Sequence, residues 1–161
     1  MKQIVFTIPL DSPEISLPTR SMTTNSMIQA TPGAVDAAKI AKVELPRGVP
    51  RSRLSVWLVD GKLIRDSLPK TDYIGGGHFF KFQWIPEGEI WIEKDTPTGD
   101  VKYYMLHELC ERAHMALGME YEEAHARAAR KEAWCRKHPN FLDECISRAI
   151  VRNIEVEKSG Q

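Results

Sequence analysis

The sequence predicts an α+β fold in which a small, mainly antiparallel sheet is followed by three helices. Two observations predict it: short apolar and β-branched runs between turn residues over residues 54–93, and helical spacing of apolar residues from about residue 101 onward. Because the strands precede the helices, the helices are expected to pack on one face of the sheet. The chain of 161 residues is long enough for one domain with its own core.

Local composition divides the chain into three parts. Residues 1–50 are rich in Ser, Thr, Pro and Gly, which predicts an irregular N-terminal arm with one short helix at Ala34–Lys42. Residues 51–157 form the predicted α+β domain, and residues 158–161 a disordered tail. Whether the arm covers the domain, mediates assembly or stays mobile is left open, as is the oligomeric state.

The predicted sheet begins with a hairpin. The runs Leu54–Val59 and Lys62–Arg65 are joined by Asp60-Gly61, a dipeptide typical of hairpin turns. His78–Trp84 alternates loosely, and Glu89–Ile92 is a further apolar strand. Together these segments predict four or five strands.

Three helices should follow the sheet. The first keeps helical spacing over Val101–Leu117 and ends at Gly118, which suits the left-handed conformation that often closes a helix. The second runs over Tyr121–Lys137 and stops before Pro139. The third starts near Asn140 and carries apolar residues at helical spacing as far as Ile154.

Composition argues against several classes of function. Lys and Arg total 22, Asp and Glu total 22, and no basic tract stands out, so neither nucleic acid nor an anionic membrane is a favoured partner. The apolar start Ile4–Ile8 is shorter than a signal-peptide core, and no later run approaches a membrane span. The odd number of cysteines, Cys110, Cys135 and Cys145, favours reduced thiols. The sequence therefore predicts a cytoplasmic protein.

The most informative motif is His107-Glu108-Leu109-Cys110-Glu111, in the first predicted helix. It is close to the zinc-peptidase motif His-Glu-x-x-His, in which two ligands lie one helical turn apart and the intervening glutamate is the general base. Here Glu111 takes the place of the second histidine. A carboxylate oxygen also binds zinc, but its negative charge weakens the metal as a Lewis acid.

The second predicted helix supplies a third ligand. His125 and Glu132 lie on its apolar stripe, so they should face the protein, where an unpaired imidazole or carboxylate is costly. The preferred metal ligands are His107, Glu111 and His125, which would leave a fourth position for water. Glu132 is a further ligand or an acceptor for an imidazole N–H, and His114 is the other spare ligand.

Two residues next to these ligands are the catalytic candidates. Glu108 would act as general base toward a water molecule activated by the metal. Arg112 would neutralise Glu108 or Glu111, or bind a substrate oxyanion. For Arg112 an exposed ion pair with Glu108, one turn away, is an equally good interpretation.

A series of short motifs extends from residue 54 to residue 136. They are Val59-Asp60-Gly61, Ile64-Arg65-Asp66, Gly76-Gly77-His78, Ile85-Pro86, Glu89-Ile90-Trp91-Ile92, His107-Glu108-Leu109-x-Glu111-Arg112 and Gly118-x-x-Tyr121-x-x-Ala124-His125. Together they resemble a group of small phage and bacterial proteins described as zincin-like metallopeptidases, with His-Glu-Leu-x-Glu-Arg in place of His-Glu-x-x-His. The resemblance implies a minimal zincin-like fold, one zinc ion per chain, and the cytoplasm of a bacterium or a phage-infected cell.

In zincins an edge strand before the active-site helix binds an extended peptide by strand addition. The resemblance therefore implies a peptide or protein substrate. It also implies a substrate-binding strand made of Glu89, Ile90, Trp91, Ile92 and Glu93. The expected function is that of a zinc-dependent metallopeptidase or related hydrolase.

Three other interpretations stay open. A polar cluster beside an apolar helical stripe is often a solvated face. The spacing Glu122-x-x-His125 also occurs in carboxylate-bridged di-iron proteins. Finally, the chain could be a non-catalytic, phage-type accessory or binding protein whose His/Glu cluster is a structural metal site or a buried polar network.

Overall fold

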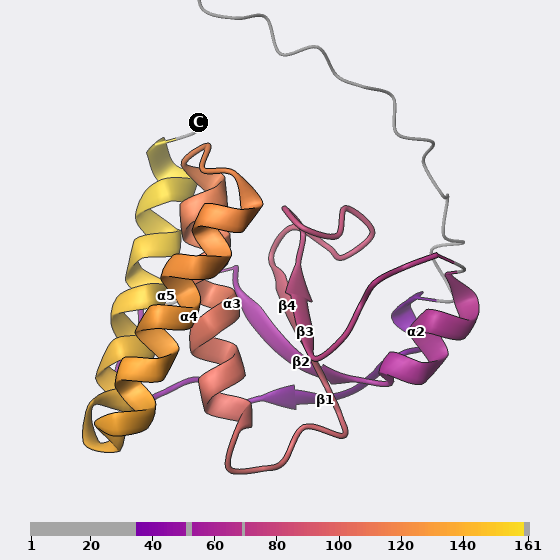
Figure 1. Cartoon of the computed structure of the whole chain (residues 1–161), viewed down its shortest axis with the longest axis horizontal. Helices are drawn as coiled ribbons and strands as arrows, with labels where there is room; N and C mark the ends of the chain where they lie inside the picture. The colour runs from indigo at the N-terminus through magenta and orange to yellow at the C-terminus, as the bar shows by residue number, and fades with distance from the viewer. Residues whose placement is uncertain (1–34, 51–52, 69, 160–161) are drawn as a thin grey trace, which may run out of the picture.

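A four-stranded mixed sheet forms the centre of the molecule (Figure 1). The computed structural model describes residues 35–50, 53–68 and 70–159. The strands are β1 (Lys39–Val43), β2 (Ser55–Val59), β3 (Gly76–His78) and β4 (Glu89–Glu93), in the spatial order β1-β2-β4-β3. The β1–β2 and β3–β4 pairs are antiparallel and the β2–β4 pair is parallel, so β3 is an edge strand and β4 lies inside the sheet.

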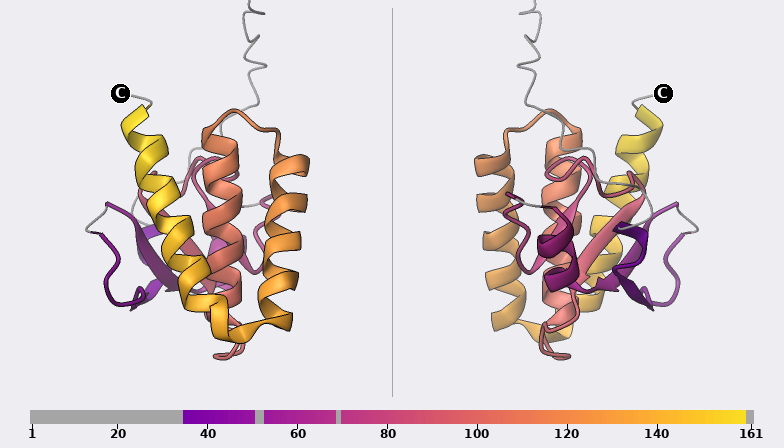
Figure 2. Two further views of the ribbon diagram at one scale, coloured as in Figure 1. Left: turned by 90° about the vertical axis from the view of Figure 1, so that its left-hand side faces the viewer. Right: turned by 90° about the vertical axis from the view of Figure 1, so that its right-hand side faces the viewer.

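Three helices form a layer on one face of this sheet (Figure 2). They are α3 (Val101–Ala116), α4 (Tyr121–Lys137) and α5 (Leu142–Ser159), with the short 3₁₀ helix η1 (Pro139–Phe141) before the last. Helix α3 lies in the middle of the layer, with α4 and α5 at its sides. The α+β prediction, with three helices after the sheet, is therefore confirmed.

Both faces of the sheet are covered by apolar side chains. Alternation along β4 turns Ile90 and Ile92 toward the three-helix layer and Trp91 toward the other face, and all three are fully buried. On that other face Trp91 packs in a second core with Ile64 of α2 (Gly61–Ser67). The three-helix layer therefore meets only one side of β4.

Two predicted elements are wrong. The helix expected at Ala34–Lys42 does not extend beyond residue 36, because Lys39–Val43 pairs with β2 as β1. The second strand of the expected hairpin, residues 62–65, belongs to α2. The Asp60 side chain accepts a hydrogen bond from the Leu63 N–H at 3.0 Å, so the Asp-Gly pair caps a helix and does not close a hairpin.

The predicted boundaries also differ from the described structure. Residues 39–43 of the expected arm contribute a strand to the sheet, whereas residues 1–34 lie outside the described residues. Residues 158 and 159 of the expected tail end α5, and residues 160–161 are not described. Of the strand expected at His78–Trp84, only His78 is in a strand.

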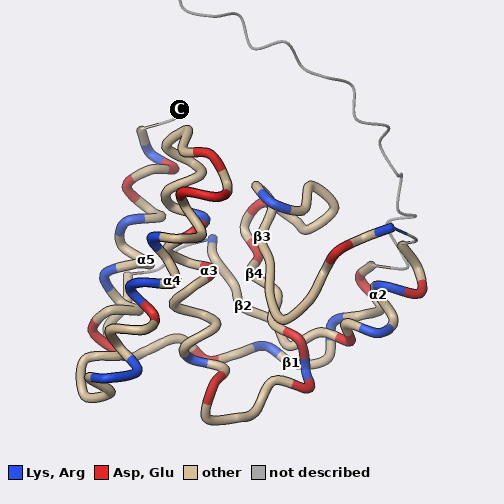
Figure 3. Tube along the Cα trace, in the orientation of Figure 1, with Lys and Arg blue, Asp and Glu red and all other residues tan. Residues whose placement is uncertain are grey.

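Charged residues of both signs are interspersed along α4 and α5 (Figure 3). Several form pairs one turn apart, such as Arg127 with Glu123 and Arg136 with Glu132. No helix in the described part of the chain has the length and apolar character needed to cross a membrane.

A buried polar link joins α3 to α5. The Arg112 guanidinium is 1% exposed and donates to Asn153 Oδ1 at 2.7 Å, to the Glu87 carbonyl at 3.0 Å and to Glu157 Oε1 at 2.9 Å. The Asn153 amide in turn donates to the Leu109 carbonyl at 2.9 Å. A buried cation needs such partners, since an unpaired one would cost several kcal/mol.

We expect Asn153→Ala to lower the free energy of unfolding by about 2–3 kcal/mol, because it leaves a buried charged donor and a buried carbonyl with one partner fewer. Chemical denaturation monitored by circular dichroism measures this change. Asn140→Ala, at an exposed site in η1, is the control and should change stability by less than about 0.5 kcal/mol. Equal stability of the two variants would contradict the proposed role of the link.

Candidate metal centre

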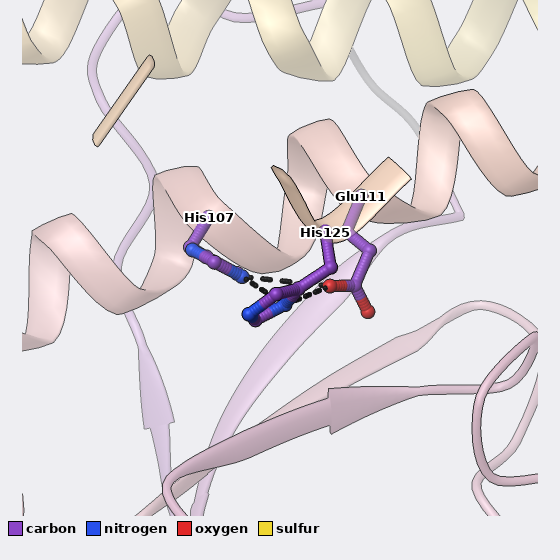
Figure 4. A group of neighbouring side chains, drawn as sticks. All are labelled: His107, Glu111 and His125. Atoms are coloured by element: carbon purple, nitrogen blue, oxygen red, sulfur yellow. Dashed lines mark hydrogen bonds and ion pairs between the residues drawn. The ribbon is translucent and has the colours of Figure 1, made fainter. Parts of the chain in front are cut away.

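The candidate site lies where α3 faces the edge strand β3 and the helix α4. Helix α3 supplies His107 and Glu111, which lie one turn apart on the same face. His125 comes from α4, which returns beside α3 after the turn at Gly118, a residue with φ of 88°. Figure 4 shows the three side chains pointing toward one another.

The donor atoms of these three residues form a small triangle. His107 Nε2 lies 3.1 Å from His125 Nδ1 and 3.4 Å from Glu111 Oε2, and His125 Nδ1 lies 2.8 Å from Glu111 Oε2 (Figure 4). Two ligand atoms of a tetrahedral zinc ion, bound at 2.0–2.1 Å, are about 3.3 Å apart. The donor set and its spacing therefore fit a zinc ion with one further coordination position.

A carboxylate outside the triangle orients His107. Its second nitrogen, Nδ1, donates to Glu132 Oε2 at 2.9 Å, and Glu132 Oε1 accepts from Arg136 Nε at 2.8 Å. Such a bond fixes the tautomer of an imidazole so that the other nitrogen is free to bind a metal. The sequence left open whether Glu132 is a metal ligand or an acceptor for an imidazole N–H, and in the structure it is the acceptor for His107.

His78 is a site residue that the sequence analysis did not assign. It is fully buried at the end of β3, and its Nε2 donates to Glu111 Oε1 at 3.1 Å. Burial lowers the pKa of His78, although its bond to Glu111 opposes that shift, so the imidazole is held neutral. The alternation of β3 brings it here, because Gly76 and His78 face α3 while Gly77 faces the second core.

Glu111 is the common partner of all three histidines. Burial alone would raise the pKa of Glu111, but its hydrogen bonds with His107, His78 and His125 outweigh burial and hold the pKa well below its usual range. Burial also opposes protonation of His107, yet Glu111, Glu108 and Glu132 together raise the pKa of His107. The centre is therefore an ionised carboxylate among imidazoles.

Glu108 lies beside the triangle with its carboxyl group against β3. A Cβ atom placed on Gly76 would lie 2.6 Å from Glu108 Oε1, so only glycine leaves room for this carboxyl. The side chain is 7% exposed and accepts no hydrogen bond from the described residues. Burial, with the nearby charge of Glu111, raises the pKa of Glu108 to about 8.

A small pocket gives access to these groups. Its volume is about 110 Å³, and Glu108, Glu111, His125 and Tyr121 are among the residues that line it. The Tyr121 ring stacks on His125 with a centroid separation of 5.5 Å. A water molecule or the end of a substrate in this pocket would contact both the carboxylate of Glu108 and the histidine-carboxylate triangle.

Three predictions about the site differ from the structure, and the first concerns Arg112. Arg112 was expected to pair with Glu108 or Glu111. Its hydrogen bonds are instead with Asn153, Glu87 and Glu157. Its side chain is directed to Asn153 and Glu157 of α5. Helix α5 lies on the other side of α3 from α4 (Figure 2).

The predicted substrate strand is also wrong in one respect. Residues Glu89 to Glu93 form β4, which is paired on both sides, so its backbone has no free edge for a peptide. The edge strand on the α3 side is β3. His114, the spare ligand, is half-buried about one turn beyond Glu111 and joins neither of the two groups of potential ligands among the described residues.

Comparisons of this chain with protein-family models, with curated proteins and with solved structures found no match.

In metal-free protein, the raised pKa of Glu108 predicts a loss of stability as pH rises. The folded state holds the Glu108 proton up to a pKa of about 8, while the unfolded state releases it near the usual 4.5. This contribution is complete below pH 4.5 and is lost as pH rises through 8. Across this window, wild-type protein should lose stability relative to Glu108→Gln by a few kcal/mol (~1.4 kcal/mol per pKa unit).

Urea unfolding in a chelating buffer, over about pH 5 to pH 9, measures this difference. Glu122→Gln controls for loss of one carboxylate at an exposed site of α4. Parallel pH profiles for wild-type protein and Glu108→Gln would contradict the assignment of a proton-holding, buried Glu108.

Proposed function

We propose that this protein is a zinc-dependent hydrolase that cleaves peptide or related amide bonds. The observation that carries the proposal is the triangle of His107, Glu111 and His125 donor atoms beside an unpaired, buried Glu108 carboxyl in a pocket. Two histidines and one carboxylate are a ligand set found in catalytic zinc sites.

His107, Glu111 and His125 would hold the zinc ion, and Glu132 would orient His107. When bound, zinc supplies a Lewis acid that lowers the pKa of water and polarises a carbonyl group. Glu108 lies close enough to the triangle to share its pocket, and it accepts a proton once a nearby positive charge lowers its pKa. The chemical step for which Glu108 is suited is proton removal from the attacking water.

The edge strand β3 supports a peptide as substrate. It is three residues long, it borders the pocket through Gly76 and Gly77, and its outer side is unpaired in the described sheet. An extended peptide added to this edge would pass over Glu108, which packs against Gly76. We therefore propose β3, and not β4, as the substrate-binding strand.

The second candidate is a non-catalytic protein in which the same residues form a buried polar network. It is favoured by the bonds that His107 and Glu111 of α3 make with Glu132 and His125 of α4, which connect the two helices without an ion. Metal content separates the two candidates.

Protein purified without a chelator or a histidine tag, in buffer without added zinc, should retain about one zinc ion per chain. Glu111→Ala and His125→Ala should lose it, as measured by mass spectrometry of the metal. Glu108→Gln should retain zinc but hydrolyse an unstructured protein substrate about 10²–10⁴-fold more slowly than wild type. Absence of zinc, even after incubation with zinc, would favour the polar network instead.

Glu132→Gln should weaken zinc binding about 10–100-fold, because an amide is a poorer acceptor for the His107 N–H than a carboxylate. Competition with a chromogenic chelator gives the dissociation constant. Glu123→Gln, an exposed carboxylate on the same helix, should leave zinc affinity unchanged. Similar affinities for the two variants would remove Glu132 from the centre.

A further inference from the structure

A second group of potential metal ligands adjoins the first. His78, Glu108 and Glu111 each offer a donor atom, and these atoms lie within 4.8 Å of one another. The three residues are 0%, 7% and 3% exposed, respectively. Glu108 is the informative member, because it is 7% exposed, accepts no hydrogen bond from the described residues and lines the pocket, so its carboxyl lacks a protein partner at a place that a cation can reach.

Glu111 belongs to both groups through different oxygens. Its Oε2 lies 2.8 Å from His125 Nδ1 and 3.4 Å from His107 Nε2, whereas its Oε1 lies 3.1 Å from His78 Nε2. A carboxylate can bind one cation through each oxygen, and such pairs of ions in proteins are about 3.5–4 Å apart. We propose that His78, Glu108 and Glu111 form a second divalent-cation site that shares Glu111 with the first; this inference rests on the proposed function.

The chemistry of the second site suits a first-row transition metal. One imidazole and two carboxylates bind zinc or manganese, and the pocket lined by Glu108 and Glu111 has room for water as a further ligand. Its affinity should be lower than that of the first site, since a cation on His107, Glu111 and His125 repels a second one nearby. The first zinc should therefore bind before the second.

Occupancy of the second site would change the role of Glu108. A glutamate bound to a cation is not free to accept a proton from water, so the second ion would inhibit hydrolysis. The site would therefore make the enzyme active with one zinc ion per chain and inactive with two. The same carboxylate thus serves as base or as ligand, depending on free zinc.

Zinc titration of metal-free protein, followed by calorimetry and by metal analysis of the equilibrated protein, tests the second site. We expect two zinc ions per chain for wild type, with the second bound more weakly. His78→Gln keeps an amide N–H for Glu111 Oε1 but removes the imidazole ligand, and it should bind one. Glu108→Gln should also bind one. His138→Gln, at an exposed histidine after α4, should still bind two.

Each other outcome has a definite meaning. One zinc ion in wild type would overturn the second site and leave the proposed function standing, and none would overturn both. Two zinc ions in His78→Gln and in Glu108→Gln would place the second ion elsewhere and overturn the inference. If His78→Gln fails to fold, Glu108→Gln alone decides. Undiminished hydrolysis of an unstructured protein by the two-zinc wild type would overturn the inhibitory role.

Discussion

The buried carboxylate of Glu111 is the interaction on which the arrangement of this protein depends. It accepts hydrogen bonds from His78 of β3 and His125 of α4, and it lies one helical turn from His107 of α3. Three elements that are distant in sequence therefore meet at one ionised group. Removing a buried charge from water is unfavourable unless it is paired, so each of the three elements must keep its place for the carboxylate to stay ionised.

Helix α3 has two different polar regions, and their separation follows from its central position. Its apolar residues Leu106 and Leu109 enter the main core, while Glu111 is directed to β3 and α4 and Arg112 to α5. Neighbouring residues on a helix are about 100° apart, so consecutive Glu111 and Arg112 are directed to different partners. The anionic centre is thereby kept apart from the nearest buried cation.

Local sequence patterns were sufficient to predict the three residues of the candidate metal site. The i, i+4 spacing of His107 and Glu111, and the position of His125 in a helix that returns antiparallel, predicted that these residues would lie together, as the structure shows. His78 could not be assigned in this way, because its contact with Glu111 depends on how β3 pairs with β4. A histidine two residues after a glycine in an alternating strand was the available signal.

The predictions that were wrong concern features determined by tertiary contacts, which local sequence does not show. An Asp-Gly pair suits a hairpin turn and a helix cap equally well, and packing of Ile64 against the second core selects the cap. The partners of Arg112 lie 41 and 45 residues along the chain, at Asn153 and Glu157, where no local spacing could indicate them. The parallel pairing of β2 with β4, which takes β4 away from the edge, is likewise set by tertiary structure.

The register of the short strand β3 determines which of its residues reach the site. Gly76 leaves room for Glu108 and His78 reaches Glu111 because both face α3, while the intervening Gly77 faces Phe82 and Ile85. A shift of one residue in the pairing with β4 would exchange these faces and turn the imidazole into the apolar core. The pairing of β3 with β4, in which Gly77 lies opposite Trp91, is therefore as necessary to the site as any of its ligands.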